Sequence, residues 1–194
     1  LCIAFCRKPM ASSLETILVT GGAGYIGSHT VKELLRQDYR VVVYDNLSTG
    51  HRESVFGGEF VEADLRDLQA LRKTFASFSI DAVMHFAASC YVGESVKDPM
   101  KYYENNVLCG MNLLGAMLER HVRHIIFSSS AAVYGNPLRT PIPEEHAQLP
   151  INPYGQTKSL FEDILRSHER VYGLRHISLR SFNAAGCDPG GEGG

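Results

Sequence analysis

Cysteine is sparse in this sequence and is not arranged in pairs. The 194 residues contain five cysteines, an odd number, which are widely scattered and form no Cys-x-x-Cys motif. This usage is typical of free thiols in a reducing compartment, so we expect a cytoplasmic protein. Clusters of metal ligands are lacking too. His121 and His124 lie three positions apart without a third ligand, which predicts no metal site.

The sequence has neither an excess of charge of one sign nor a long apolar run. Nineteen Lys and Arg residues against 21 Asp and Glu give a formal net charge of −2, so the chain has no basic field for nucleic acid or an anionic membrane. No apolar run approaches the roughly 20 residues that cross a bilayer. Since 44% hydrophobic content suffices for a core, we expect a globular protein that acts on a small molecule.

The sequence does contain a glycine-rich stretch directly after an apolar run. Thr16–Thr20 predicts a buried parallel strand, and it leads into Gly21 and the pattern Gly22-x-Gly24-x-x-Gly27, followed by apolar residues at helical spacing. In such a unit the first glycine of the pattern allows a tight turn, the second lets a pyrophosphate come close, and the third lets the helix pack on the strand. The phosphates would lie at the positive end of the helix.

Two acids follow at the ends of the next predicted strands. Asp45 comes 23 positions after Gly22, where it can accept hydrogen bonds from a ribose diol and repel a 2′-phosphate. This placement favours NAD over NADP. Asp64 and Leu65 are expected to bracket the adenine, and Asp64 also suits the N-cap of a helix beginning near Arg66.

Strand and helix patterns alternate along the whole chain. Six strands separated by helices predict an α/β fold, a doubly wound parallel sheet in the order 3-2-1-4-5-6, because parallel neighbours need right-handed crossovers. Its ligand crevice opens between strands one and four, at the carboxyl ends. The expected strands lie at 16–20, 40–44, 59–62, 81–86, 124–127 and 175–180, and the later helices at 66–78, 99–120 and 154–172.

Several polar or small residues fall at that crevice edge. Ala87 and Ala88 leave room for a cofactor at the end of strand four, and hydroxyls follow strand five at Ser128–Ser130. Asn105 is a poor helix former inside a long helix, so we expect it to point inward and hold the strand ends or reach a nicotinamide ribose. The proline-rich stretch 137–153 predicts an exposed lip beside the site.

Tyr154 and Lys158 form the second informative pattern. Four positions apart on a predicted helix, they share one face. A nearby ammonium favours the phenolate, so we expect the pKa of Tyr154 to lie below its usual value of about 10 and Tyr154 to act as a general base. Ser130 is expected to hold the same substrate oxygen. Taken alone, the pair is also explained by a buried tyrosine and a snorkelling lysine.

Together these residues resemble the extended short-chain dehydrogenase/reductase family, and within it the sugar-nucleotide 4-epimerases. The resemblance spans about residues 16–189. Beyond the glycine loop and the Tyr154/Lys158 pair, the matching stretches are Asp45–Leu47, His85–Ala88, Val92–Ser95, Tyr102–Asn106, Ser128–Gly135 and Asn152–Gly155.

The resemblance implies that NAD is bound tightly and is regenerated in each turnover, while UDP-glucose and UDP-galactose interconvert by transient oxidation at the sugar C4. Tyr154 would take the proton of the 4-hydroxyl as C4 gives hydride to NAD. The residues implied to face substrate are Ser130, Tyr154, Phe182 and Asn183. Those implied to contact the cofactor are Gly21, Gly22, Gly24, Tyr25, Ile26, Gly27, Asp45, Asn46, Asp64, Leu65, Phe86, Ala87, Ala88, Asn105, Ser128 and Lys158.

The resemblance also sets expectations for the organisation of the chain. We expect a disordered extension over 1–14, an NAD-binding Rossmann domain with the catalytic residues over 15–186, and the start of a truncated substrate region over 187–194. Similar proteins continue with a region that grips the UDP. The chain is therefore expected to be a fragment with little epimerase activity alone, and to form a homodimer through the helices around 98–120 and 154–172.

Two departures and three alternatives remain at this point. Cys90 stands where some similar proteins have a cofactor-contacting lysine, and Ser181 replaces a tyrosine. A 4,6-dehydratase would need an Asp-Glu pair where Ala131 and Ala132 stand. A 4-epimerase for UDP-pentoses or N-acetylated UDP-hexosamines is a closer alternative. A non-catalytic NAD-binding regulator would not need Tyr154 with its lysine and serine partners.

Overall fold

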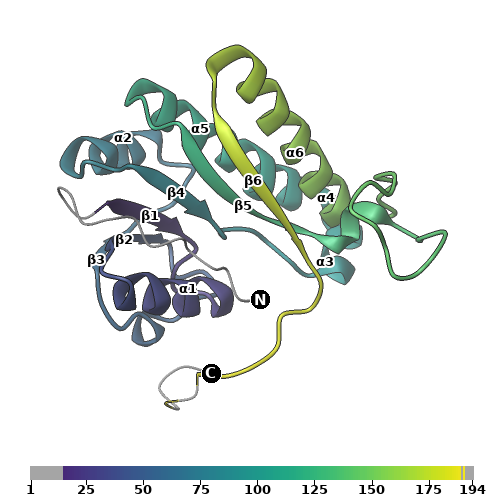
Figure 1. The fold of residues 1–194 in the computed structure, drawn as a ribbon, viewed down its shortest axis with the longest axis horizontal. Coiled ribbons are helices and arrows are strands. Elements are labelled where there is room, and N and C mark those ends of the chain that lie inside the picture. Colours follow the sequence, from purple (N-terminus) through teal and green to yellow (C-terminus); the bar gives the residue numbers. More distant parts are fainter. Residues whose placement is uncertain (1–14, 189, 191–194) are drawn as a thin grey trace.

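The computed structural model describes residues 15–188 and 190. Within this part of the chain, six parallel strands form one sheet in the order β3-β2-β1-β4-β5-β6, which confirms the predicted fold (Figure 1). The strands are β1 (Thr16–Thr20), β2 (Arg40–Asp45), β3 (Glu59–Glu62), β4 (Ala82–His85), β5 (His124–Ser130) and β6 (Arg175–Ser181). The extension expected over 1–14 lies outside the described residues.

Helices on both faces of the sheet account for its buried strands. One apolar cluster joins the sheet to α2, α5 and α6, and a second joins it to α1. Every residue of β1 is buried, as a central parallel strand requires. The α-helices are α1 (Tyr25–Arg36), α2 (Leu68–Ser77), α3 (Val92–Lys97), α4 (Pro99–Tyr102), α5 (Cys109–Glu119) and α6 (Pro153–Tyr172); η1 (Arg52–Ser54) and η3 (Ala131–Tyr134) are 3₁₀ turns.

Two predicted elements differ from the structure by more than one or two residues at an end, and α3 was not predicted. β5 continues beyond Phe127 because its pairing with β6 extends through Ser130 opposite Ser181. The helix predicted over 99–120 is divided: a π-helical turn, η2 (Tyr103–Leu108), separates α4 from α5. Helical spacing alone does not reveal such a turn, because it inserts residues without ending the helix.

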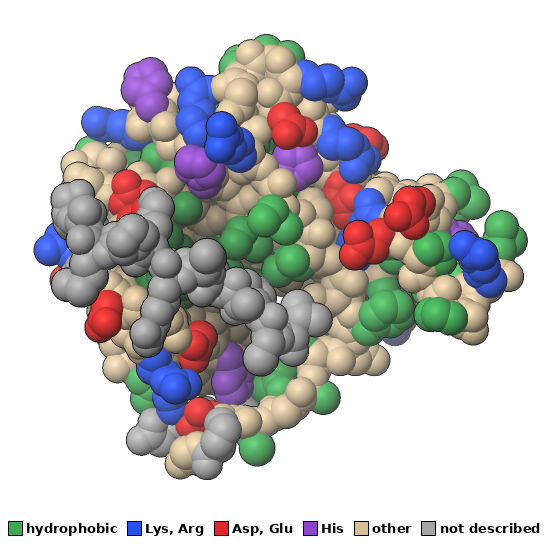
Figure 2. Space-filling view, in the orientation of Figure 1, with side chains coloured by type: hydrophobic (Ala, Val, Ile, Leu, Met, Phe, Trp, Pro, Cys, Tyr) green, Lys and Arg blue, Asp and Glu red, His purple; other side chains and the backbone are tan. Residues whose placement is uncertain are grey.

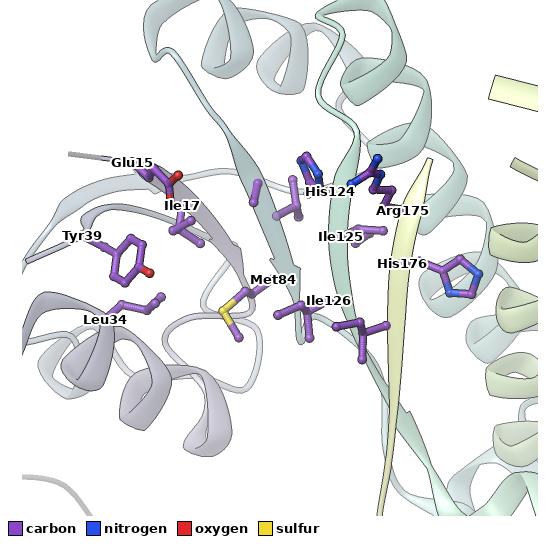
Figure 3. Close-up of a pocket in the computed structure, with 13 residues that line it drawn as sticks. Glu15, Ile17, Leu34, Tyr39, Met84, His124, Ile125, Ile126, Arg175 and His176 are labelled. Atoms are coloured by element: carbon purple, nitrogen blue, oxygen red, sulfur yellow. The ribbon is translucent and has the colours of Figure 1, made fainter. Parts of the chain in front are cut away.

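A cavity of about 400 Å³ lies against the sheet on the α1 side. Figure 3 shows Ile17, Leu34, Met84 and Ile126 around it, while His176 points away from the other labelled side chains. The lining comes mostly from the amino ends of β1, β4, β5 and β6, at the opposite edge from the glycine loop. Figure 2 shows hydrophobic side chains at the surface in the middle of this view, over the strands. The predicted ligand crevice is therefore a different place.

Candidate functional site

The glycine loop connects β1 to α1 by close backbone packing. Gly21 has φ of +71°, and a Cβ there would lie 2.5 Å from the backbone nitrogen of Ala87, so the turn can approach the end of β4 only without a side chain. A Cβ at Gly27 would collide with the carbonyl oxygen of Gly21. The helix-packing role predicted for Gly27 thus has a geometric basis. The tight turn predicted at Gly22 is instead made at Gly21, while a Cβ at Gly22 would meet Val43.

The amino end of α1 has the properties of an anion site. Gly24 is its N-cap and supplies no side-chain hydrogen bond, and the first turn contains no acid. By contrast, α2 and α6 are capped by Asp67 and Asn152. A Cβ at Gly24 would meet only the Gly21 carbonyl oxygen, at 3.4 Å. Open space in front of a helix terminus without a capping side chain suits a pyrophosphate.

Asp45 is fixed beside this loop at the end of β2. Its Oδ2 accepts a hydrogen bond from the Ala23 amide at 2.9 Å, and its Oδ1 accepts one from the Leu47 amide at 2.8 Å. The side chain is buried. Each carboxylate oxygen has a second lone pair, so the hydroxyls of a ribose can still be accepted.

Asp64 belongs to a small polar cluster at the end of β3. It accepts hydrogen bonds from Asn46 Nδ2 at 2.7 Å and pairs with Arg66 at 2.7 Å. The hydrogen bond from Arg66 holds the pKa of Asp64 well below its usual range, against the effect of burial. The prediction that Asp64 caps the next helix is wrong. Asp67 caps α2, because the chain first makes a turn in which the Arg66 amide donates to Asp64.

Leu65 lies mostly inside the protein rather than on the crevice surface. Its side chain belongs to the apolar cluster under α2 and α5, and its carbonyl oxygen accepts a hydrogen bond from Asn112 at 3.0 Å. Packing in the core accounts for this side chain without a ligand.

The loop after β4 is held mainly by Asn106. Its Oδ1 accepts from the Ser89 amide at 2.8 Å, and its Nδ2 donates to the Ser89 carbonyl at 3.0 Å and to Thr157 Oγ1 at 3.2 Å. Asn105, the residue predicted to point inward, donates to Ser89 Oγ at 3.2 Å. Sequence reasoning therefore missed Asn106, which fastens Phe86–Ser89 to both η2 and α6.

Ser130, Tyr154 and Lys158 come together at the carboxyl end of β5. Lys158 Nζ donates to the Ser128 carbonyl oxygen at 2.7 Å and lies 5.8 Å from the centre of the Tyr154 ring. Tyr154 shares a side-chain hydrogen bond with Ser130. The three side chains predicted to act together therefore lie in one cluster.

The electrostatics of this cluster differ from the prediction. Burial raises the pKa of Tyr154, although the hydrogen bond with Ser130 opposes the rise. Burial also lowers the pKa of Lys158 to about 8. The predicted lowering of the tyrosine pKa is thus wrong for the chain alone, because desolvation of the phenol outweighs the favourable hydrogen bond with Ser130.

His85 is a buried base beneath the same cluster. Its Nδ1 lies 2.7 Å from Thr20 Oγ1, in a hydrogen bond between β4 and β1. Burial, with a smaller effect of Lys158, lowers the pKa of His85 to about 3, so the ring is neutral at physiological pH. His85 belongs to the stretch His85–Ala88, but the sequence does not indicate that its side chain is buried beneath the cluster of Ser130, Tyr154 and Lys158.

The segment after β6 carries the remaining predicted residues. Phe182 is 70% exposed and Asn183 is also exposed, and neither is brought into the cluster by a hydrogen bond among the described residues. Further on, Gly186 accepts a hydrogen bond from Tyr25 Oη at 2.5 Å, and Asp188 pairs with Lys32 at 2.7 Å. The segment therefore crosses to α1 (Figure 1).

Three of the five cysteines lie within the described residues. Cys90, Cys109 and Cys187 are free thiols, and burial raises the pKa of Cys109 to about 11. The described residues contain no group of three His, Cys, Asp or Glu that could hold a metal. Residues 15–188 and 190 also include no helix long and apolar enough to span a bilayer.

The fold and the glycine loop define a doubly wound α/β protein of the dinucleotide-binding class. The model of the NAD dependent epimerase/dehydratase family matches residues 17–193, and the chain belongs to this family.

Proteins of known sequence and structure make the relation more specific. The chain is 52% identical over 176 residues to a UDP-glucose 4-epimerase of Halalkalibacterium halodurans, covering 91% of this chain and 53% of that protein. The UDP-glucose 4-epimerase of Brucella ovis in complex with NAD superposes with a TM-score of 0.91 at 54% identity, over 93% of this chain and 55% of that one. The UDP-glucose 4-epimerase of Bifidobacterium longum in complex with NAD+ and UDP superposes with a TM-score of 0.89 at 40% identity, over 92% of this chain and 56% of that one. The chain spans about half the length of these relatives.

Proposed function

We propose that this chain carries the NAD-binding and proton-transfer part of a UDP-sugar 4-epimerase that interconverts UDP-glucose and UDP-galactose. The observation that carries the proposal is the cluster of Ser130, Tyr154 and Lys158 at the sheet edge that also bears the glycine loop. The names of the relatives support the same activity. Residues 15–186 would form the cofactor-binding unit.

The chemistry of the described residues suits NAD. The pyrophosphate would lie on the amino end of α1, at Gly24, Tyr25 and Ile26, where no side chain caps the helix. Asp45 would take the adenosine ribose, and Asp64 would lie near the adenine. Bound NAD would supply a hydride acceptor and the positive charge of its ring. The remaining residues proposed to line its path are Asn46, Phe86, Ala87, Ala88, Asn105 and Ser128.

Tyr154 is proposed to move the proton of the sugar 4-hydroxyl. The hydroxyl would lie between Ser130 and Tyr154, so that Ser130 holds the oxygen while the phenolate removes its proton. Because burial raises the pKa of Tyr154, ionisation depends on added positive charge. The pKa of Lys158, about 8, leaves its ammonium mostly protonated at neutral pH to supply part of that charge.

The sugar specificity has one supported alternative. A putative UDP-arabinose 4-epimerase of Arabidopsis thaliana is 45% identical over 186 residues, so a UDP-pentose is the second candidate substrate. Dehydration is disfavoured because Ala131 and Ala132 offer no acid or base beside Ser130.

A homodimer through the helices around 98–120 and 154–172 is part of the proposal. The elements α4, η2, α5 and α6 in these ranges bear exposed apolar side chains, which favour burial against a second copy. These side chains are Met100, Leu108, Met111 and Leu160.

The test compares the wild-type chain with Tyr154→Phe, each alone for NAD binding and, for turnover, joined to the part of the Halalkalibacterium halodurans relative that this chain does not cover, because the chain alone is expected to turn over little substrate. NAD released from purified protein would be identified by mass spectrometry, rebinding measured by calorimetry, and epimerisation of UDP-galactose followed by a coupled assay. We expect both proteins to bind NAD equally and the variant to lose at least about 100-fold in turnover. Failure of the wild type to bind NAD would overturn the cofactor assignment, and equal turnover would overturn the role of Tyr154. If Tyr154→Phe loses turnover and the wild type converts UDP-arabinose faster than UDP-galactose, the pentose alternative is selected.

A further inference from the structure

Glu162 is a buried carboxylate that the proposed chemistry does not use. It lies on α6 four residues beyond Lys158, and only 1% of it is exposed. Its Oε1 accepts hydrogen bonds from Ser129 Oγ at 2.6 Å and Arg180 Nε at 3.0 Å. Its Oε2 accepts from Arg180 Nη2 at 2.7 Å and Gln148 Nε2 at 2.9 Å. One carboxylate thus joins β5, β6, α6 and the chain before α6.

Arg180 extends the network to the other end of that chain segment. Two of its nitrogens form a parallel fork with Glu162, and the third, Nη1, donates to Tyr134 Oη and to the Glu144 carbonyl oxygen, both at 3.0 Å. The planar guanidinium makes these contacts together because its donors have a fixed geometry. Residues 137–153, the predicted lip, are therefore fastened at Glu144 and at Gln148.

Apart from these hydrogen bonds, little apolar burial holds the lip against the rest of the protein. Leu138 is 93% exposed, and Leu149 and Ile151 are also exposed. Besides the ties to the buried ion pair, Gln148 Oε1 accepts a hydrogen bond from Ser159 at 2.7 Å, and the His146 ring lies edge-on to Tyr134 with ring centroids 5.8 Å apart. A loop with so little apolar burial opens at low free energy unless polar contacts hold it.

The two ends of the lip lead to the proposed catalytic groups. Ser130 and the η3 turn with Tyr134 precede it, and Tyr154 stands in the first turn of α6 directly after it. A shift of the lip would therefore be transmitted to the spacing between Ser130 and Tyr154.

We propose that Glu162 and Arg180 form a clamp that holds the lip closed and thereby fixes the position of Ser130 relative to Tyr154. Both are positioning residues, since neither is placed to touch substrate. The catalytic consequence rests on the proposed function, whereas the clamping of the lip does not.

Arg180→Lys is the variant that separates charge from geometry. Lysine keeps the positive charge beside Glu162, which avoids leaving an unpaired buried carboxylate. It cannot bond both oxygens of Glu162 and also reach Glu144 and Tyr134. Arg166→Lys is the matched control, because Arg166 reaches the same carboxylate only at 3.4 Å from a more exposed position on α6.

Limited trypsin digestion measures the lip directly, since Arg139 is exposed within it. With cleavage after Arg139 followed by mass spectrometry, we expect Arg180→Lys to be cut at least about fivefold faster than wild type and Arg166→Lys at the wild-type rate. Gln148→Leu removes one tie without touching the buried pair, and we expect an increase of about twofold. Unchanged cleavage in both Arg180→Lys and Gln148→Leu would overturn the clamp. Equal acceleration in Arg166→Lys would show a general loosening and overturn it as well.

Activity measurements test the consequence for the site. We expect Arg180→Lys to lower kcat for UDP-galactose about tenfold while Kd for NAD stays unchanged, because a small displacement of catalytic groups costs rate rather than cofactor affinity. The same variant should shift the pH profile of kcat, which a loss of overall stability would not do. Normal kcat in Arg180→Lys would overturn the positioning role. The activity measurements use the chain joined to the part of the relative that it does not cover; an inactive wild type in that form would count against the proposed function but leave the proteolysis result to decide the clamp.

Discussion

The two halves of the sheet build their parts of the crevice in different ways. In the half containing β1, β2 and β3, the proposed phosphate site is made by backbone: a positive φ at Gly21, a missing Cβ at Gly27 and a helix end without a capping side chain. In the half containing β4, β5 and β6, it is made by buried polar side chains such as Asn106, Lys158 and Glu162. A backbone site depends on spacing and steric room, whereas a side-chain site depends on desolvation and partners. The two halves should therefore respond differently to mutation and to pH.

His85 joins the two halves and should give the largest effect. Its folded pKa of about 3 lies below the unfolded value of 6.5, so its contribution to stability is present above pH 6.5 and is lost as the pH falls toward 3. Between pH 7 and 4 we expect it to cost about 3 kcal/mol. Urea denaturation of wild type and His85→Gln at both pH values measures this. A variant with the same pH dependence as wild type would contradict the prediction.

Gly27→Ala tests the backbone half. Since its Cβ would collide with the Gly21 carbonyl oxygen, we expect a loss of about 2–3 kcal/mol in the free energy of unfolding together with loss of NAD binding. Gly24→Ala is the matched control. Its free energy of unfolding should be nearly that of wild type, because its Cβ meets only one atom, at 3.4 Å. It should nevertheless bind NAD more weakly. Equal stability of the two variants would show that the loop is not sterically determined.

Lys158→Met tests the side-chain half at alkaline pH. Burial lowers the folded pKa of Lys158 from 10.5 to about 8, so burying its charge destabilises the fold below pH 8, and this cost is relieved as the pH rises toward 10.5. Relative to Lys158→Met, wild type should gain about 1 kcal/mol between pH 7 and 9. Chemical denaturation at the two pH values checks the sign. A constant difference would indicate that the ammonium is not desolvated.

Gly115→Ala should give the smallest effect. It measures how much an alanine changes the free energy of unfolding at a helical glycine that has no close neighbours. The residue lies within α5, and no atom would come within 4 Å of the added Cβ. We expect a gain of about 0.5–1 kcal/mol from helix propensity, measured as a rise in Tm. A destabilised variant would weaken the interpretation that open space alone distinguishes Gly115 from Gly27.

The backbone half could be predicted closely from the sequence. β1 and β3 begin and end where the apolar pattern indicated, and Asp45 closes β2 beside the loop. Glycine spacing and β-branched runs report directly on steric room and strand burial. The N-cap of α2 could not be predicted from the sequence. Asp64 and Asp67 are both suitable capping residues, and only the structure shows that Asp67 caps α2.

The side-chain half could be predicted in its components but not in its energetics. Tyr154 and Lys158 share a helix face as their spacing indicated, yet the direction of the tyrosine pKa depends on burial that spacing does not encode. Glu162 and Arg180 look like surface charges in the sequence, and their pairing appears only when α6 packs on β6. The sequence does not distinguish Asn105 from Asn106, because the extra residue of the π turn shifts which side chain faces inward.

The π-helical turn η2 determines how the protein should respond to the deletion of a residue between α4 and α5. A π turn closes each bond over one residue more than an α turn, so the segment behaves as an α-helix with a single residue inserted. Shortening Tyr103–Leu108 by one position would let α4 and α5 merge into one continuous helix with the apolar side of α5 still in register. The fastening of Ser89 by Asn106 would then be lost. The extra residue therefore serves the loop after β4 and its tie to α6, both of which depend on Asn106.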